Sequence, residues 1–310
     1  MKDFAGKIAV ITGGGTGMGR ELARGLVAEG CDVAICDVSD ANMQETVALC
    51  KSEAPQGIRV TSFRCDVSKP DEMDAFRDHV REAFNTAHIN LLFNNAGIAG
   101  GGSFLNETRE QWEKTFNVCW GGVYNGTRSF MPLLVAGTEG HIINTSSING
   151  IWASAGPHAA HTAYSSAKFA VRGFTESLIT DLRLHAPHVQ ASVVMPGHVG
   201  TSILLNATNT GVTSDDGGRT LLRMMGGTDV DRMSADEVDN AIRAAGETFR
   251  DNAPTTAKEA ATIILDGVKA GRWRILIGAD AHSLDELIRA TPEDAYETEF
   301  VARWATARKR

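Results

Sequence analysis

The sequence contains few tyrosines, no excess of basic residues and no long apolar run near its N-terminus. Tyrosine accounts for three of the 310 residues. Acidic residues outnumber basic ones, 38 to 30, and the formal net charge of -8 argues against binding to nucleic acid or to an anionic membrane surface. The first apolar run, residues 8–12, is too short for a signal peptide or a membrane span.

Cysteine is also sparse and follows no metal-binding or disulfide pattern. No C-x-x-C pair occurs, and the five cysteines are irregularly spaced: Cys31, Cys36, Cys50, Cys65 and Cys119. We therefore expect reduced thiols, most of them in or near the core, in a cytoplasmic protein. The hydrophobic fraction of 43% and the charged fraction of 22% are typical of an ordinary globular protein, and we expect a single domain over residues 1–310.

Apolar segments of strand length alternate with longer segments of helical period. The predicted strands are residues 7–12, 32–37, 59–66, 89–95, 140–147, 190–196 and 272–278. Most are apolar on both sides of the pleat, which is typical of strands buried in a parallel sheet. The alternation predicts an α/β fold: a Rossmann-like, doubly wound parallel sheet of about seven strands with helices on both faces. Capping boxes predict helix starts at Thr108, Ser234 and Thr256.

Two segments fall outside this alternation. Residues 202–255 form a long connection of the kind that often covers a ligand. Its apolar side chains either do so or only pack a helix onto the core; they are Leu204, Leu205, Leu221, Leu222, Met224 and Met225. Residues 279–310 predict a C-terminal helical extension with apolar positions at Leu284, Leu287, Ile288, Phe300, Val301 and Trp304. This extension covers the core or reaches a neighbouring subunit.

A glycine cluster, TGGGTGMG at residues 12–19, directly follows the first strand and opens the first helix. Glycines let the backbone approach a pyrophosphate, and the N-terminus of a helix supplies N–H donors and a positive partial charge. A simple strand-to-helix turn needs fewer glycines than this segment has. The cluster therefore predicts a dinucleotide site.

The second strand ends at Asp37, about 20 residues beyond the glycine cluster. A carboxylate at this place accepts hydrogen bonds from the hydroxyls of the adenosine ribose and repels a 2′-phosphate. The nearby positions where a phosphate-binding base might stand hold Thr16 and Val38. The sequence therefore predicts NAD rather than NADP as the cofactor.

Tyr164 and Lys168 lie one helical turn apart in a stretch of small residues, HTAYSSAKFA. Residues i and i+4 share one face of a helix, so the phenol and the ammonium would meet with room for a third molecule. Lowering the pKa of a tyrosine from about 10 to about 7 requires roughly 4 kcal/mol. An ammonium at about 4 Å in an effective dielectric near 20 supplies about that much. We therefore expect Tyr164 to have a lowered pKa.

Several motifs together resemble the short-chain dehydrogenase/reductase family over roughly residues 4–201. The motifs are TGGGTGMG (12–19), CDV (65–67), NNAG (94–97), FNVCWGG with Asn117, SSING with Ser147, YSSAK (164–168) and PGHVGT (196–201). The spacing of the glycines is similar to that of the compact branch of the family rather than to the epimerase–dehydratase branch. The resemblance implies hydride transfer between an alcohol or ketone and a nicotinamide dinucleotide, with no need for a metal.

The resemblance also implies a role for each matching residue. Tyr164 would be the general acid/base, Lys168 would bind the nicotinamide ribose, Ser147 would bond the substrate oxygen, and Asn117 would hold a relay water. Asp66 and Val67 would meet the adenine, Asn95, Ala96 and Gly97 would border its ribose, and Val199 and Thr201 would hold the carboxamide. The remaining predicted cofactor contacts are Gly13, Thr16, Gly17, Met18, Gly19, Asp37, Val38, Pro196 and Gly197.

One departure from the family pattern is an insertion between Ser147 and Tyr164, about four residues longer than in many members. It brings Trp152, His158 and His161 near the expected substrate position. The two histidines have no accompanying carboxylate or cysteine, so a metal site is not expected. We predict an NAD-dependent enzyme that acts on a small-molecule secondary alcohol or ketone with an apolar body, as a homodimer or homotetramer. An NAD-sensing binding protein and a dehydratase or epimerase are the alternatives.

Overall fold

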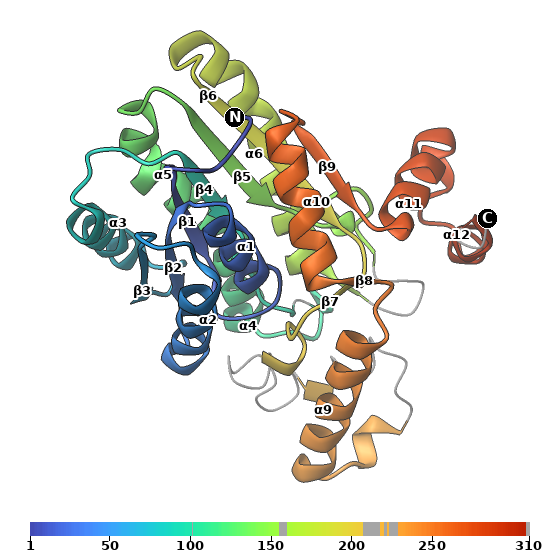
Figure 1. Ribbon diagram of the computed structural model, residues 1–310. Helices are drawn as coiled ribbons and strands as arrows, with labels where there is room; N and C mark the ends of the chain where they lie inside the picture. Colours follow the sequence, from blue (N-terminus) through green and yellow to red (C-terminus); the bar gives the residue numbers. More distant parts are fainter. Residues whose placement is uncertain (101, 155–159, 207–217, 220–221, 223–228, 308–310) are drawn as a thin grey trace.

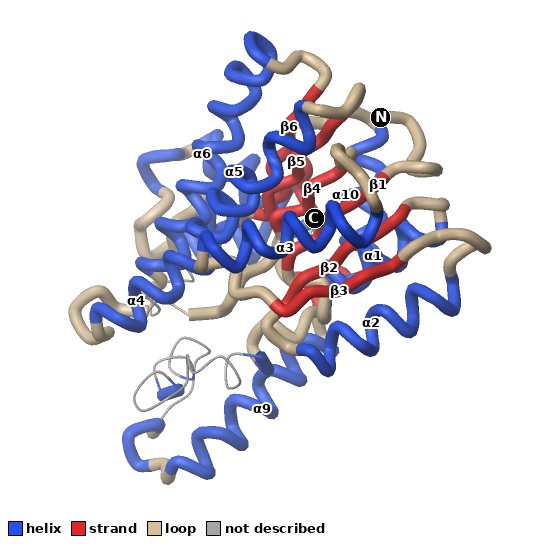
Figure 2. Tube along the Cα trace, turned by 90° about the vertical axis from the view of Figure 1, so that its left-hand side faces the viewer, coloured by secondary structure: helices blue, strands red, loops and turns tan. Residues whose placement is uncertain are grey.

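A parallel sheet with helices on both faces forms the body of the protein (Figures 1 and 2). The computed structural model describes residues 1–307 except 101, 155–159, 207–217, 220–221 and 223–228. Seven parallel strands lie in the order β3-β2-β1-β4-β5-β6-β9. Their bounds are β1 Ile8–Thr12, β2 Asp32–Asp37, β3 Val60–Arg64, β4 Leu91–Asn94, β5 Gly140–Thr145, β6 Val189–Pro196 and β9 Arg274–Ile277. All seven predicted strands and the doubly wound fold are confirmed.

Helices pack against both faces of the sheet. On one face, α1 contacts both α2 and α10, and on the other, α3 contacts α5, while α6 packs on β6. The bounds are α1 Gly17–Ala28, α2 Asp40–Glu53, α10 Ala257–Lys269, α3 Pro70–Phe84, α5 Gly122–Val135 and α6 Thr162–His185. Figure 2 shows the strands lying between these two layers of helices.

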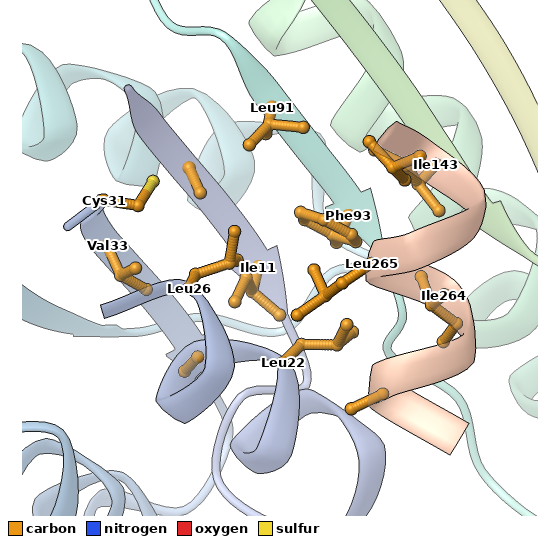
Figure 3. Packing of buried hydrophobic residues seen from close by; sticks show 14 of the residues in the cluster. Ile11, Leu22, Leu26, Cys31, Val33, Leu91, Phe93, Ile143, Ile264 and Leu265 are labelled. Carbon is orange, nitrogen blue, oxygen red and sulfur yellow. The ribbon is translucent and has the colours of Figure 1, made fainter. Parts of the chain in front are cut away.

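Apolar side chains from α1 and α10 close over the central strands (Figure 3). Ile11 of β1 and Phe93 of β4 meet Leu22 and Leu26 of α1 and Leu265 of α10 in one buried cluster. Fully burying a side chain of this size contributes about 1.5–3 kcal/mol, so this layer fixes β1 and β4 side by side. The ends of these two strands carry the segments that form the site described below.

The order of the strands reverses between β1 and β4, because β2 and β3 lie on one side of β1 and β5, β6 and β9 lie beyond β4. In an open α/β sheet, the connections that leave the carboxyl ends of the strands at this place diverge to opposite faces and leave a crevice. The fold therefore provides a binding place just beyond Thr12 and Asn94.

The 202–255 segment connects the two short strands of a separate two-stranded sheet. β7, Val199–Gly200, pairs in parallel with β8, Thr255–Thr256. Between them, α9, Ala235–Asp251, lies away from the sheet (Figure 1). Its buried side chains belong to a small separate apolar core, which consists of Ala99, Leu204, Leu222, Val230, Val238 and Ile242. Leu221, Met224 and Met225 lie outside the described residues, so the prediction that the segment covers a substrate stays a prediction.

The C-terminal extension forms two helices beside β9, the edge strand (Figure 1). They are α11, Ala279–Ala290, and α12, Phe300–Ala307, joined by a single 3₁₀ turn at Pro292–Asp294. The capping boxes at Thr108, Ser234 and Thr256 are all formed. The five cysteines are free thiols and buried. None of the helices that the structure describes is long and apolar enough to cross a membrane.

Candidate active site

A cavity of about 570 Å³ lies at the carboxyl ends of β1, β2 and β4, where the strand order reverses. This volume is within the range of known small-molecule and cofactor sites. The cavity is lined by predicted contacts from five separate segments: Gly13, Thr16, Gly17, Met18, Asp37, Val38, Asp66, Val67, Asn95, Ala96, Gly97 and Thr201. Sequence reasoning missed the other lining residues, which are Ser39, Asn42, Cys65, Ile98, Lys114, Val118, Ile203 and Asn206.

The glycine-rich loop is packed so closely that a Cβ would clash at several positions, among them Gly13 and Gly19. Gly13 has φ of +66°, and a Cβ there would lie 2.8 Å from the Cα of Ala96. A Cβ at Gly19 would lie 2.1 Å from the carbonyl oxygen of Gly13. Gly19 does not line the cavity, and the absence of a side chain there allows α1 to pack closely against the loop. Its predicted contact with the cofactor stays a prediction.

Thr12 joins the glycine-rich loop to the NNAG segment. Its Oγ1 accepts hydrogen bonds from the backbone N–H groups of Asn95 and Ala96 at 3.0 and 3.1 Å. The Asn95 amide in turn donates to the carbonyl oxygens of Thr12 and Gly13. Asn95 therefore fixes the position of the glycine-rich loop relative to the end of β4. The sequence signal for the Thr12 hydrogen bonds was the threonine at the end of the first strand.

Asp37 lies at the end of β2 with its carboxylate against the glycine-rich loop. Oδ2 accepts a hydrogen bond from the N–H of Gly15 at 3.0 Å, and Oδ1 accepts one from the N–H of Ser39 at 3.1 Å. The side chain is half-buried and lines the cavity. Among the described residues that line this cavity, Lys114 of α4 (Arg109–Phe116) is the one with a cationic side chain.

Tyr164 and Lys168 meet on one face of α6, as the spacing predicts. The Lys168 ammonium lies 5.3 Å from the centre of the Tyr164 ring and donates a hydrogen bond to the Thr145 carbonyl at 2.9 Å. The side chain of Lys168 is buried, and the Ser146 hydroxyl donates to its carbonyl oxygen. Among the residues that the structure describes, the ammonium thus has one fixed acceptor, which leaves its other N–H groups for a ligand.

Ser147 stands at the end of β5 and interacts through its hydroxyl with the Tyr164 phenol. Its Oγ also accepts a hydrogen bond from the N–H of Asn149 at 3.1 Å. Serine, tyrosine and lysine therefore come together from two elements, β5 and α6. None of the three lines the cavity itself, but a methyl group on Gly97, which does, would lie 3.7 Å from the Lys168 ammonium, so the cluster lies next to the cavity behind Gly97.

The predicted lowering of the Tyr164 pKa is wrong for the protein chain by itself. Burial raises the pKa of the Tyr164 phenol above its ordinary value, nearby Cys119 acts in the same direction, and the hydrogen bond with Ser147 acts in the opposite one. Burial also lowers the pKa of Lys168. The physical reason is that taking the phenolate out of water costs more than the polar neighbours within the chain return.

Asn117 has an exposed side chain, and its predicted role as the residue that holds a relay water stays a prediction. Residues 117–121 form a turn of π-helix, and this wide turn presents Cys119 to the cluster. The Cys119 thiol is fully buried and lies 3.8 Å from where a methyl group on Gly97 would be.

His161, which the insertion was expected to bring near the substrate position, lies against Tyr164. Its imidazole stacks on the Tyr164 ring, with the ring centres 4.7 Å apart and the planes within 17°. Burial lowers the pKa of His161 to about 4, so the ring is neutral at physiological pH. Its position three residues before the tyrosine, at the start of α6, was the available signal.

The PGHVGT segment reaches the cavity only through Thr201. That residue lies beside Gly17, whereas Pro196, Gly197 and Val199 do not line the cavity. Asp280 of α11 supports this turn, because its carboxylate accepts a hydrogen bond from the N–H of His198 at 2.6 Å. No group of three possible metal ligands occurs among the described residues. His158 lies outside them.

Comparison with known proteins places the chain among the short-chain dehydrogenases. The profile of the family described as "short chain dehydrogenase" matches residues 7–210. The chain belongs to this family. "Putative oxidoreductase SadH" of Mycobacterium tuberculosis is 35% identical over 290 residues, which cover 93% of this chain and 92% of SadH. A "3-alpha-(or 20-beta)-hydroxysteroid dehydrogenase" of the same species is 35% identical over 63% of this chain and 70% of its own length.

Solved structures of related enzymes have the same fold. A short-chain dehydrogenase/reductase from Burkholderia phymatum in complex with NAD is 28% identical, with a TM-score of 0.77 over 94% of this chain and 96% of that one. A metagenomic short-chain oxidoreductase in complex with NADP is 30% identical, with a TM-score of 0.55 over 63% of this chain and 83% of that one. The family thus uses NAD or NADP. The close approach of Gly13 to Ala96 leaves backbone, not side chain, at the wall of the cavity, which fits a dinucleotide.

Proposed function

We propose that the protein is an NAD-dependent dehydrogenase that interconverts a secondary alcohol and a ketone. The observation that carries the proposal is the meeting of Ser147, Tyr164 and Lys168 behind Gly97, which lines the cavity beside the glycine-rich loop. A cluster of this kind suits proton transfer at an oxygen atom, and a dinucleotide supplies the hydride chemistry when bound.

In the direction of oxidation, the phenolate oxygen of Tyr164 accepts the hydroxyl proton of the alcohol. The Ser147 hydroxyl donates a hydrogen bond to the same substrate oxygen and holds it within reach of the phenol. In the direction of reduction, the Tyr164 hydroxyl returns a proton to the oxygen that gains negative charge. Lys168 keeps its ammonium beside the phenol, where it favours the phenolate, and its free N–H groups suit a ribose hydroxyl.

The pKa of Tyr164 in the chain alone is raised, so the proposed base needs a further stabilising charge. An oxidised nicotinamide ring is cationic, and a cation beside the phenol favours the phenolate. Tyr164 is therefore an effective base only in the complex with the oxidised cofactor. This ordering favours binding of the dinucleotide before the alcohol.

We assign NAD rather than NADP on the placement of Asp37. Its carboxylate lines the cavity on the side of the glycine-rich loop, where a 2′-phosphate would meet like charge. We also propose an apolar body for the substrate, because Ile98 and Ile203 line the cavity and Leu204 belongs to the apolar cluster beside Ala99.

The test is a panel of secondary alcohols and ketones, apolar hydroxysteroids included, incubated with NAD or NADP while the absorbance of the reduced nicotinamide is followed. We expect turnover with NAD that Tyr164→Phe abolishes, although that variant still binds NAD. Tight NAD binding by the wild type without turnover on any member of the panel would instead favour an NAD-sensing protein. Loss of water or inversion at carbon without net formation of reduced NAD would favour a dehydratase or an epimerase.

A further inference from the structure

The C-terminal extension packs onto the segment that directly follows Ser147. Trp152 is 4% exposed and lies in one apolar cluster with Leu284 of α11 and Phe300 of α12, and Ile148 packs against this cluster. The Trp152 ring centre is 5.4 Å from that of Phe300 and 5.8 Å from that of Trp304. The segment from Ile148 to Trp152, which directly follows Ser147, is therefore packed against residues about 140 positions later in the chain.

Two hydrogen bonds fix the same segment from the turn between α11 and α12. The Trp152 indole N–H donates to the carbonyl oxygen of Ala295 at 2.7 Å. The N–H of Ala153 donates to the hydroxyl oxygen of Tyr296 at 3.2 Å. Trp152 is thus fixed through its side chain and Ala153 through its backbone, in addition to the aromatic packing.

Asn149 links this anchored segment to Ser147. Its amide donates to the carbonyl oxygens of Trp152 and Ser154 at 3.2 and 2.7 Å, and its backbone N–H donates to the Ser147 hydroxyl at 3.1 Å. A shift of Trp152 would therefore move Asn149, and with it the hydrogen bond that orients the Ser147 hydroxyl.

The same extension also supports the turn after β6. Asp280, in the first turn of α11, is 4% exposed and accepts the hydrogen bond from the N–H of His198. A Cβ on Gly197 would lie 2.2 Å from the Asp280 carboxylate, so α11 is seated directly on the turn. Trp304 connects the two contacts, because its indole N–H donates to the Asp280 carbonyl and its ring packs on Trp152.

We propose that residues 279–307 are a positioning element of the active site, in which Trp152 and Tyr296 hold the Ser147 hydroxyl in the geometry that the substrate oxygen requires. The inference rests on the proposed function, because it gives Ser147 its role. Trp152 and Tyr296 are positioning residues, and they act on turnover rather than on binding of the cofactor. Their contacts lie on the Ser147 side of the site, away from the glycine-rich loop.

Tyr296→Phe tests the proposal with little change in packing, and Trp152→Phe tests it together with the loss of part of a buried ring. Each removes one of the two hydrogen bonds, and Tyr296 is 65% exposed, so its variant is expected to fold. We expect kcat/KM for the alcohol to fall about threefold to tenfold, which matches the net value of one hydrogen bond. The dissociation constant of NAD should stay within about twofold of the wild type. Trp273→Phe and Tyr124→Phe, at residues exposed by 46% each, are the matched controls and should leave kcat/KM unchanged.

A double-mutant cycle distinguishes positioning of Ser147 from a general loss of structure. In a Ser147→Ala background, Trp152→Phe should cause little further loss, because there is no hydroxyl left to orient. Losses that multiply in the double variant would overturn the proposal, as would unchanged kcat/KM in both Trp152→Phe and Tyr296→Phe.

Amide hydrogen exchange tests the inference independently of the proposed function, because the measurement needs no substrate. In Tyr296→Phe, amides of residues 148–153 should exchange faster than in the wild type, while amides of β1 and α1 should be unchanged. Equal exchange in residues 148–153 would overturn the inference even if the enzyme is active. Absence of turnover in the wild type, together with faster exchange in the variant, would count against the proposed function and leave the contact established.

Discussion

The Lys168 ammonium lies 5.3 Å from the centre of the Tyr164 ring, one helical turn further along α6. His161 stacks on the same ring from three residues earlier. The phenol is thus flanked along one face of a helix by a neutral imidazole and by an ammonium whose position the Thr145 carbonyl fixes. These two neighbours restrict rotation of the Tyr164 ring, and the hydrogen bond with Ser147 orients its hydroxyl group.

Gly13→Ala should weaken binding of the dinucleotide and reduce stability. The new methyl group would lie 2.8 Å from the Cα of Ala96, in a backbone conformation with φ of +66° that costs an alanine about 1–2 kcal/mol. We expect the NAD dissociation constant, measured by calorimetry, to rise at least about tenfold. Gly173→Ala is the control, because nothing lies within 4 Å of its Cβ and it sits inside α6. That variant should be more stable by about 0.5–1 kcal/mol. Normal NAD binding by Gly13→Ala would contradict the assignment of the cavity.

Asp37→Asn should shift the cofactor preference toward NADP. The amide oxygen can still accept one of the hydrogen bonds from Gly15 and Ser39, but the negative charge that repels a 2′-phosphate is gone. The ratio of kcat/KM for NAD to that for NADP should fall about tenfold, equivalent to about 1.4 kcal/mol. Asp40→Asn removes an exposed carboxylate nearby and should leave the ratio unchanged. A wild-type preference for NADP would contradict the proposal that Asp37 selects NAD.

Substitution at Cys119 should affect turnover more than substitution at Asn117. The Cys119 thiol is buried beside Tyr164 and Lys168, whereas Asn117 is exposed. We expect Cys119→Ala to change kcat about fivefold, equivalent to ~1 kcal/mol, and to move its pH profile. Asn117→Ala should change kcat less than twofold. The reverse ranking would support Asn117 as the residue that holds the relay water.

Local signals in the sequence predicted the strands, the three capping boxes and the meeting of Tyr164 with Lys168, because each depends on residues within a few positions of one another. The direction in which the Cys119 side chain points depends on a π-helical turn, and the residue types at 117–121 do not predict such a turn. The raised pKa of Tyr164 depends on how far the phenol is removed from water, which the whole fold sets. The contact between Trp152 and Ala295 joins residues 143 positions apart, and no local pattern encodes such a pairing.

Stability should fall as the pH is lowered from about 7 toward 4, because His141 is buried in β5 against the Ser192 hydroxyl. Burial lowers the pKa of His141 from 6.5 to about 4. The unfolded chain therefore binds a proton below pH 6.5 that the folded chain refuses until about pH 4, and acid favours unfolding over this window. The full loss is of the order of 3 kcal/mol. In His141→Gln, the fall in Tm with acid should be shallower than in the wild type, whereas His185→Gln, at an exposed histidine, should behave as the wild type does. An equal slope in wild type and His141→Gln would contradict this account.

The pH dependence of catalysis tests the role of Tyr164 as acid and base. Oxidation of the alcohol needs the phenolate, so kcat/KM for oxidation should rise with pH until the tyrosine in the cofactor complex is deprotonated. Reduction of the ketone needs the protonated phenol and should fall over the same range. Because the phenol pKa is raised in the chain alone, spectroscopic titration of the protein should show the tyrosine ionising at lower pH with oxidised NAD bound than without it.

The most direct test of the central claim is turnover by Tyr164→Phe in the presence of saturating NAD. Removing the hydroxyl keeps the ring that His161 stacks on and should leave NAD binding within about twofold of the wild type. We predict a loss of kcat of at least about a hundredfold, the smallest contribution typical of a general acid or base, with no remaining pH dependence from this group. A Tyr164→Phe enzyme that keeps wild-type turnover and the wild-type pH profile would contradict the account.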